Sequence, residues 1–197
     1  YLDTGAMYRA VALKALEKGL DCKDPAQIIP MLSMTNLSIF YHQDQQHVYL
    51  DGKDVTDLIR FPRVSAAASD IAVIPEVRMM LVKIQRELAQ RYSLVIDGRD
   101  IGTFVLPNAD KKFYLTATLE ERARRRWLEM QDKGYNTDFE EIKRDLEKRD
   151  LNDSNRAFAP LRKAEDAILI DTTGKTIEQV VDEVCSHLAG VLDLDKR

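Results

Sequence analysis

The stretch Leu94-Val-Ile-Asp-Gly-Arg-Asp-Ile-Gly-Thr103 indicates the fold class of this chain. Its first three residues form an apolar run with two β-branched members, which is typical of a buried strand in a parallel sheet. A polar turn follows at once and carries Asp97, Gly98, Arg99 and Asp100. Because ligands of open α/β sheets bind outside the carboxyl ends of the strands, this turn is a candidate site for a charged ligand. Asp and Gly also favour turns in general, so a turn closed by its own Arg–Asp pair is an equally weighted alternative.

The composition fits one large domain, or one domain with a small insert. The 197 residues are 45% hydrophobic and 31% charged, and the formal net charge of −4 argues against bulk nucleic-acid binding. No apolar run is long enough to span a bilayer and no stretch resembles a signal peptide, so we expect a cytoplasmic protein without a membrane partner. Two distant cysteines and three histidines without ligand spacing predict no protein-held metal.

Helical and strand patterns alternate along most of the chain, which predicts a parallel α/β sheet. We expect helices over residues 4–18, 21–33 and 75–91, an Ala-rich helix that begins at Ser65, and strands over residues 111–116 and 167–171. In the helix over 75–91, Arg78 lies off the apolar stripe and is therefore expected to face solvent or a ligand. A closing helix follows Thr176, and the side chains expected to be buried on it are Ile177, Val180, Val181, Val184, Leu188 and Val191.

Between residues 35 and 55 the apolar residues alternate with a period of two instead. The pattern predicts strands over 37–41 and 47–50, and the Asp51-Gly52 dipeptide favours a hairpin turn. Residues 53–55 are a candidate third strand. We interpret this region as a small antiparallel insert between helical segments.

Residues 120–162 are the most polar part of the chain and hold eight of its 16 arginines. Eleven basic residues are matched there by eleven acidic ones, as in a pair of solvated helices with i, i+4 ion pairs. The bias toward Arg over Lys is not required by a solvated face, and the planar guanidinium suits bidentate phosphate contacts. We therefore interpret the region as a mobile lid that closes arginines over phosphates. Capping boxes are expected at Thr118–Glu121 and Thr176–Gln179.

Three motifs, taken in order, resemble those of the bacterial cytidylate kinases, a family of nucleoside monophosphate kinases. They are Asp3-Thr-Gly-Ala-Met-Tyr-Arg9, Asp97-Gly-Arg-Asp-Ile-Gly-Thr103, and Arg149-Asp-Leu-Asn-Asp-Ser-Asn-Arg156 leading into Ala159-Pro-Leu161. The match covers nearly the whole chain, and the β insert fits the enlarged monophosphate-binding region of that family. The resemblance implies a P-loop NTPase-like parallel sheet with flanking helices, and phosphoryl transfer from ATP to CMP or dCMP. Mg²⁺ would be held by phosphates and water.

The resemblance also implies roles for particular residues. The CMP phosphate would be held by Arg9, Arg99 and Arg156, the cytosine would be read by Ser69, Arg78 and Asp100, and the ribose would be contacted by Arg149 and Asp153. Thr4, Tyr8 and Gly98 complete the substrate-binding set, and Arg99, Arg149 and Arg156 are the expected catalytic arginines. Arg122, Arg125 and Arg126 would approach ATP.

The chemistry of cytosine fits those roles. A carboxylate such as Asp100 can accept from the N4 amino group, while Arg78 and Ser69 can donate to N3 and O2. Uracil presents an acceptor at position 4, so the same carboxylate would disfavour it. Asp97, at the expected strand end, is a candidate for ordering the water shell of Mg²⁺, and a purely structural turn residue is nearly as plausible.

The implied organisation is a kinase core over residues 1–34 and 71–197, a monophosphate-binding insert over 35–70, and a lid over 118–162. The phosphate-binding sequence Gly-x-x-x-x-Gly-Lys-[Ser/Thr] does not occur in the 197 residues. We expect the natural protein to carry it on a βα unit before Tyr1, which leaves open whether this chain is active by itself. By resemblance, a monomer is expected.

Three alternatives stay open at this point. The first is a monophosphate kinase for UMP or AMP, and the second is a nucleotide-binding module without catalysis. The third, an RNA-binding helix built on residues 122–126, is disfavoured by the equal number of acidic residues.

Overall fold

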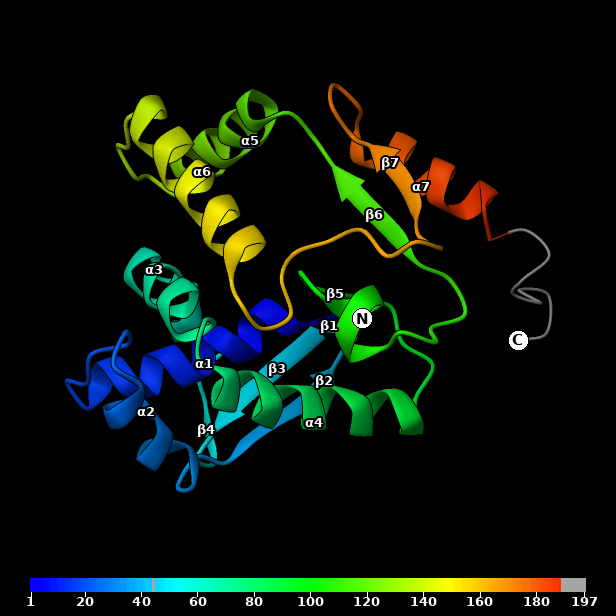
Figure 1. The fold of residues 1–197 in the computed structure, drawn as a ribbon. Coiled ribbons are helices and arrows are strands. Elements are labelled where there is room, and N and C mark those ends of the chain that lie inside the picture. Colours follow the sequence, from blue (N-terminus) through cyan, green and yellow to red (C-terminus); the bar gives the residue numbers. More distant parts are fainter. Residues whose placement is uncertain (44, 189–197) are drawn as a thin grey trace. The chain divides into compact units, whose positions relative to one another are not determined.

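A computed structural model describes residues 1–43 and 45–188, which divide into two compact units (Figure 1). The first unit comprises residues 1–101 together with 156–160, and the second comprises the rest of the described chain. The chain therefore leaves the first unit after Ile101, returns to it for five residues at Arg156–Pro160, and leaves it again.

The first unit contains two small sheets and four α-helices. A parallel pair of strands, β1 (Leu2–Asp3) and β5 (Ile96–Asp97), is in register with Leu2 opposite Ile96. An antiparallel sheet is formed by β2 (Leu37–His42), β3 (Gln45–Leu50) and β4 (Lys53–Asp54). The helices are α1 (Thr4–Glu17), α2 (Pro25–Leu32), α3 (Pro62–Ile71) and α4 (Pro75–Arg91), with a short 3₁₀ helix η1 (Leu58–Arg60) before α3.

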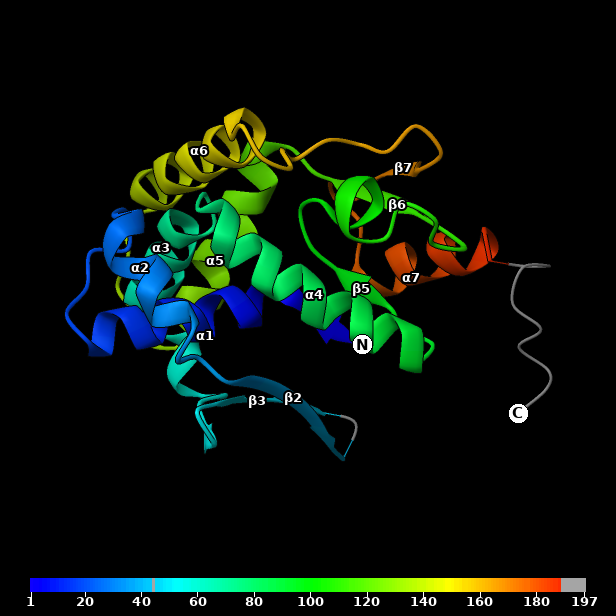
Figure 2. The same cartoon turned by 60° about the horizontal axis from the view of Figure 1, so that its bottom comes forward.

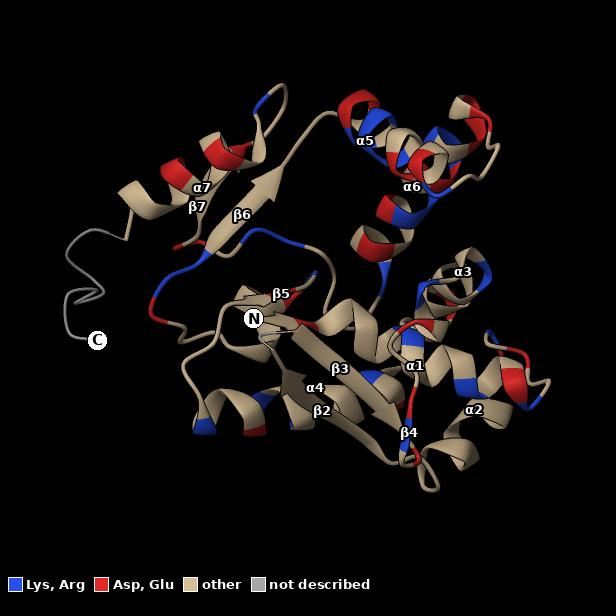
Figure 3. Ribbon diagram, turned by 180° about the vertical axis from the view of Figure 1, so that it is seen from behind, with Lys and Arg blue, Asp and Glu red and all other residues tan. Residues whose placement is uncertain are grey.

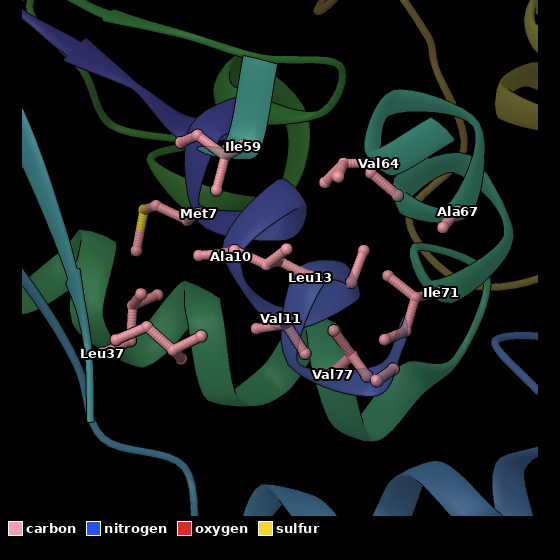
Figure 4. Packing of buried hydrophobic residues seen from close by; sticks show 14 of the residues in the cluster. Met7, Ala10, Val11, Leu13, Leu37, Ile59, Val64, Ala67, Ile71 and Val77 are labelled. Carbon is pink, nitrogen blue, oxygen red and sulfur yellow. The ribbon is translucent and has the colours of Figure 1, made fainter. Parts of the chain in front are cut away.

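Helix α1 is the centre of the core of this unit. Asp3 caps its first turn by accepting from the amide of Ala6, and small alanines along the helix let neighbouring elements pack closely. Figure 4 shows side chains of α1 facing residues from η1, α3, α4 and β2; the labelled ones are Met7, Ala10, Val11, Leu13, Leu37, Ile59, Val64, Ala67, Ile71 and Val77. The start of α1 is therefore held in place by packing along its whole length.

The antiparallel sheet forms a layer of its own beside the helices of the first unit (Figure 2). Asp51 and Gly52 both have positive φ, at 51° and 82°, in the two-residue loop between Leu50 and Lys53, which is the geometry of a type I′ hairpin turn. Lys14, buried on α1, forms an ion pair of 2.6 Å with Asp51. The expected hairpin and third strand are confirmed.

The second unit has a parallel pair of strands and three helices. Strands β6 (Phe113–Thr116) and β7 (Ile168–Asp171) pair with Phe113 opposite Ile168. Helices α5 (Leu119–Asp132) and α6 (Phe139–Asn155) pack through a small cluster around Ala123 and Ile142, and basic and acidic residues lie along both of them (Figure 3). Helix α7 (Ile177–Ser186) follows β7.

The expected parallel α/β architecture is confirmed, but two expectations of burial are wrong. Val95 is 73% exposed, because β5 packs one face only: its neighbour Ile96 lies against the core, and alternation turns Val95 the other way. On α7, Ile177 and Val181 are 80% and 51% exposed, and no residue of that helix is buried within the described chain. Val180, Val184 and Leu188 are half-buried, and Val191 lies outside the described residues.

Among the described residues, no helix combines the length and the apolar character that crossing a membrane requires.

The insert offers a test of stability against pH. The Asp54 carboxylate accepts hydrogen bonds from the amide and hydroxyl of Thr56 and lies 2.9 Å from Nδ1 of His47. The Thr56 bonds in particular lower the pKa of Asp54 to about 2. A carboxyl whose pKa is lowered on folding stabilises the fold above its unfolded pKa, and this contribution is lost as the pH falls through the folded value.

We therefore expect Asp54→Asn to lower the free energy of unfolding near pH 6 by about 1 kcal/mol or less, because the group is partly exposed. The deficit relative to wild type should shrink between about pH 4 and pH 2. Urea unfolding followed by circular dichroism across that range measures it. Asp57→Asn, at an exposed position before η1, is the matched control. A deficit that stays constant with pH would contradict the assignment.

Candidate functional site

A buried carboxylate between two guanidinium groups lies directly after β5. Asp100 is 5% exposed, and its Oδ2 accepts from Nη2 of Arg78 at 2.5 Å. Its Oδ1 lies 3.6 Å from Nη2 of Arg156, whose side chain is only 4% exposed. The carboxylate and both guanidiniums lie away from solvent, where charged groups are costly unless partners compensate them.

Arg78 points inward from α4. Its Nη1 donates to the carbonyl of Ala72 at 3.2 Å, and its Cζ lies 5.4 Å from the centre of the Tyr8 ring, within cation–π range. Its Nε is buried and makes no hydrogen bond within the described chain, and such a donor costs about 1–3 kcal/mol if left unfilled. The expectation that Arg78 faces solvent or a ligand is wrong for solvent: the residue is 1% exposed.

The five residues that return to the first unit fix Arg156. Arg156 Nε donates to the carbonyl of Ala159 at 2.6 Å, and Ala159 adopts a positive φ of 49°. This tight turn holds the guanidinium beside Asp100. Ser69, half-buried on α3, lies three residues before Ala72, the residue that accepts from Arg78.

A second charged group surrounds the start of α1. Oδ2 of Asp3 accepts from Nη2 of Arg9 at 2.7 Å, while Oδ1 of Asp3 caps the helix. Burial lowers the pKa of Arg9, and the charge of Asp3 opposes this effect. Thr4 Oγ1 donates to the carbonyl of Asp97 at 2.7 Å and ties the start of α1 to the end of β5. The pKa of Asp97 is raised, chiefly by burial of its carboxyl.

Position 98 requires glycine, because the side chains of Thr4 and Ile101 lie too close to its backbone to leave room for a Cβ atom. A Cβ at this position would lie 2.6 Å from Oγ1 of Thr4 and 2.8 Å from Cδ1 of Ile101. A side chain would therefore push the turn away from α1. The polar turn Asp97–Asp100 is thus held against the start of α1 by both a hydrogen bond and contact.

The remaining predicted residues lie in the second unit or on the surface of the first. Arg99 is exposed, and Arg149 and Asp153 are half-buried on α6, where the Asp153 carbonyl accepts from the amide of Leu161 at 2.7 Å. The predicted site residues that the structure gathers in the first unit are Thr4, Tyr8, Arg9, Ser69, Arg78, Gly98, Arg99, Asp100 and Arg156.

The arginines expected to approach ATP each have partners within the second unit. Arg122 pairs with Asp150 at 2.6 Å, and Arg126 pairs with Glu129 at 2.6 Å. Arg125 donates to Glu121 and to both oxygens of Thr172 at the end of β7. These pairs account for the balanced charge of the region and leave little surplus charge for RNA.

The two expected capping boxes differ. At α7, Thr176 and Gln179 cap one another reciprocally. At α5, Thr118 accepts from the amide of Glu121, but the Glu121 carboxylate turns to Arg124 and Arg125, which lower its pKa to about 2. The second half of the expected box at α5 is therefore replaced by helix-surface ion pairs.

Three residues near Asp3 were not among the site residues predicted from the sequence. Arg60 Nη1 lies 3.3 Å from Oδ2 of Asp3, the Tyr1 hydroxyl donates to Asp97 at 2.9 Å, and the amide of Gln46 pairs with the backbone of Asp3 through both its oxygen and its nitrogen. Only the fold brings them together, because they come from η1, the chain start and β3. A π-helical turn, η2 (Ile101–Val105), directly after Asp100 was also not expected.

Within the described chain, no three His, Cys, Asp or Glu side chains gather as a metal site. Mg²⁺ commonly binds through substrate phosphates, water and one or two carboxylates, so the carboxylate of Asp97 at the end of β5 is compatible with an Mg²⁺–nucleotide complex.

We expect Gly98→Ala to destabilise the protein by about 1–3 kcal/mol, since the new methyl group overlaps Thr4 and Ile101. Gly102→Ala is the matched control, because its nearest contact is 3.2 Å to Cδ of Lys112, the flexible part of a long side chain. Urea unfolding of both variants makes the comparison. Equal stability of the two would show that the turn does not depend on close approach.

Comparison with known proteins extends these observations. A family model described as cytidylate kinase matches residues 1–189. The chain is 52% identical over 184 residues to a protein named cytidylate kinase from Caldicellulosiruptor bescii, an alignment that covers 93% of this chain and 81% of that protein. It is 47% identical over 188 residues to a cytidylate kinase from Clostridioides difficile, with 95% and 85% covered. A cytidylate kinase from Desulfitobacterium hafniense is 50% identical over 186 residues, with 94% and 80% covered.

Proposed function

Because the chain belongs to the cytidylate kinase family, we propose that it transfers the γ-phosphoryl group of ATP to CMP or dCMP. The products are ADP and CDP or dCDP. The observation that carries the proposal is the buried group formed by Arg78, Asp100 and Arg156, which combines a carboxylate acceptor for an amino group with two guanidinium donors.

Asp100 and Arg78 offer hydrogen-bonding groups that match those of cytosine. A carboxylate offers about four lone-pair positions, so Asp100 can accept from the cytosine N4 amino group while it remains bonded to Arg78. The buried Nε of Arg78 is a donor without a partner in the described chain, and an acceptor of the base would satisfy it. Ser69, on the neighbouring helix, is the candidate for the remaining donor.

The CMP phosphate would bind at the other side of the same group, at Arg156. Arg156, with Arg9 and Arg99 from the first unit, would hold the CMP phosphate, which carries nearly two negative charges at neutral pH. Since Asp100 contacts both Arg78 and Arg156, occupation of the base position and of the phosphate position would be coupled through one carboxylate. Tyr8 supports Arg78, and Thr4 and Gly98 fix the turn.

The second unit would supply the ribose and ATP contacts. Arg149 and Asp153 would contact the ribose, and Arg149 would join Arg99 and Arg156 at the transferred group. Arg122, Arg125 and Arg126 would exchange Asp150, Thr172 and Glu129 for ATP phosphates on lid closure. Phosphoryl transfer depends chiefly on positioning and charge neutralisation, which arginines supply together with the Mg²⁺ that ATP carries.

Binding of the acceptor nucleotide tests the proposal on residues that the structure describes. Calorimetric titration of the 197-residue chain should show CMP and dCMP binding at least about 10-fold more tightly than UMP or AMP, the equivalent of about 1.4 kcal/mol. ATP-dependent conversion of CMP to CDP is measured alongside. Tighter binding of UMP or AMP, or no binding by a chain that circular dichroism shows to be folded, would overturn the proposal.

Asp100→Asn tests the role of the carboxylate. The amide can donate to the uracil oxygen at position 4, so the ratio of CMP to UMP affinity should fall by about 10- to 100-fold. Breaking a buried ion pair costs about 3–5 kcal/mol, so the folded fraction is measured first and titrations are run well below the melting temperature. Asp110→Asn, at an exposed carboxyl, is the control. An unchanged ratio in folded Asp100→Asn would remove Asp100 from base recognition.

A further inference from the structure

One oxygen of Asp3 is shared by two arginines. Nη2 of Arg9 lies 2.7 Å from Oδ2, and Nη1 of Arg60 lies 3.3 Å from the same atom. The other oxygen of Asp3 is engaged by the amide of Ala6. A single carboxylate oxygen therefore serves two cations, and the Arg60 contact is the longer of the two.

Arg60 has a fixed backbone and an exposed head group. It ends η1, whose preceding residue Ile59 is fully buried against α1 and bonds through its amide to the carbonyl of Val55 at 3.0 Å (Figure 4). The Arg60 side chain is nevertheless 53% exposed. The guanidinium can thus change partner without any movement of the core.

The charges around Asp3 leave room for an anion. Arg9 and Arg60 both contact one oxygen of Asp3, so two guanidiniums share a single carboxylate oxygen at this point. Burial is the main cause of the lowered pKa of Arg9, and repulsion by the nearby charge of Arg60 adds to it. An incoming dianion would relieve that repulsion.

We propose that Arg60 is a further phosphate-binding residue, which leaves Asp3 and donates to the phosphate of the nucleoside monophosphate that Arg9 holds. This inference rests on the function proposed above. Asp3 stays bonded to Arg9 and to the start of α1 and so keeps Arg9 aimed. Because both arginines reach the same oxygen atom, one phosphate group can bridge them through charge-assisted bonds of about 2.8 Å.

Arg9 supports the assignment from its own side. Its Nε is buried and has no hydrogen-bond partner within the described chain. Gly5 is part of the same arrangement, since a Cβ there would lie 3.1 Å from Nη1 of Arg9 and 3.1 Å from Oδ1 of Asp3. The guanidinium of Arg9 therefore lies close to Gly5, and its Nε is a donor to which a phosphate oxygen could bind.

The test compares CMP with cytidine, which lacks only the phosphate. In the full chain, Arg60→Gln should weaken CMP binding by about 5- to 20-fold, the loss of one charge-assisted bond at a half-exposed group, and should leave cytidine binding within about 2-fold. Arg60→Lys should restore part of the CMP affinity, since it keeps the charge. The loss should shrink as salt is raised.

Arg63→Gln is the matched control, because it removes the same charge from an exposed arginine three residues further along, on α3. It should change CMP binding by less than about 2-fold. Unfolding in urea confirms that the variants are folded. A merely structural role of Arg60 would lower CMP and cytidine affinity together.

Failure of the proposed function and failure of the role of Arg60 give different results. If the wild-type chain binds CMP no better than cytidine, UMP or AMP, the proposed function fails. If the wild type prefers CMP and Arg60→Gln preserves the ratio of CMP to cytidine affinity, the function stands and the role of Arg60 is overturned.

Discussion

The carboxylate of Asp100, buried between Arg78 and Arg156, is the interaction on which the candidate site depends. Removing a carboxylate from water is costly, and contacts with the two guanidiniums offset that cost. Each neighbour therefore has to be positioned by independent structure: Arg78 by a long helix, and Arg156 by a tight turn at Ala159. A carboxylate has several accepting positions, so one rigid group can combine a hydrogen-bond acceptor with guanidinium donors.

The arginines of the two units differ in burial and in the partners that they contact. In the first unit, the two arginines that contact Asp100 have side chains that are 2% and 4% exposed. In the second unit, surface arginines of α5 pair with nearby acids, such as Arg126 with Glu129 one turn away. Exposed pairs of that kind contribute about 0–1 kcal/mol each, so they can be exchanged cheaply for a phosphate.

Most helices, strands and turns could be predicted from the sequence, because hydrophobic periodicity and turn residues are local signals. The helix over 75–91 and the Asp51-Gly52 hairpin were predicted with correct bounds or nearly so. Local patterns failed where burial depends on partners far away in the chain. Arg78 lies off an apolar stripe yet is buried, because Asp100 neutralises it, and Val95 is apolar yet exposed. Arg60 left no local signal, since its contact with Asp3 spans 57 residues. Which of the predicted site residues contact nucleotide remains a prediction.

The return of Arg156–Pro160 to the first unit also bears on how the chain is made. Arg78 and Asp100 leave the ribosome well before Arg156, which follows after more than fifty further residues. At about 5–20 residues per second, that interval lasts several seconds. During this time Arg156 is absent from the nascent chain, so its contact with Asp100 can form only when most of the second unit has been synthesised. Neither unit is encoded by one continuous stretch, and gene fragments cut at Ile101 would separate Asp100 from Arg156.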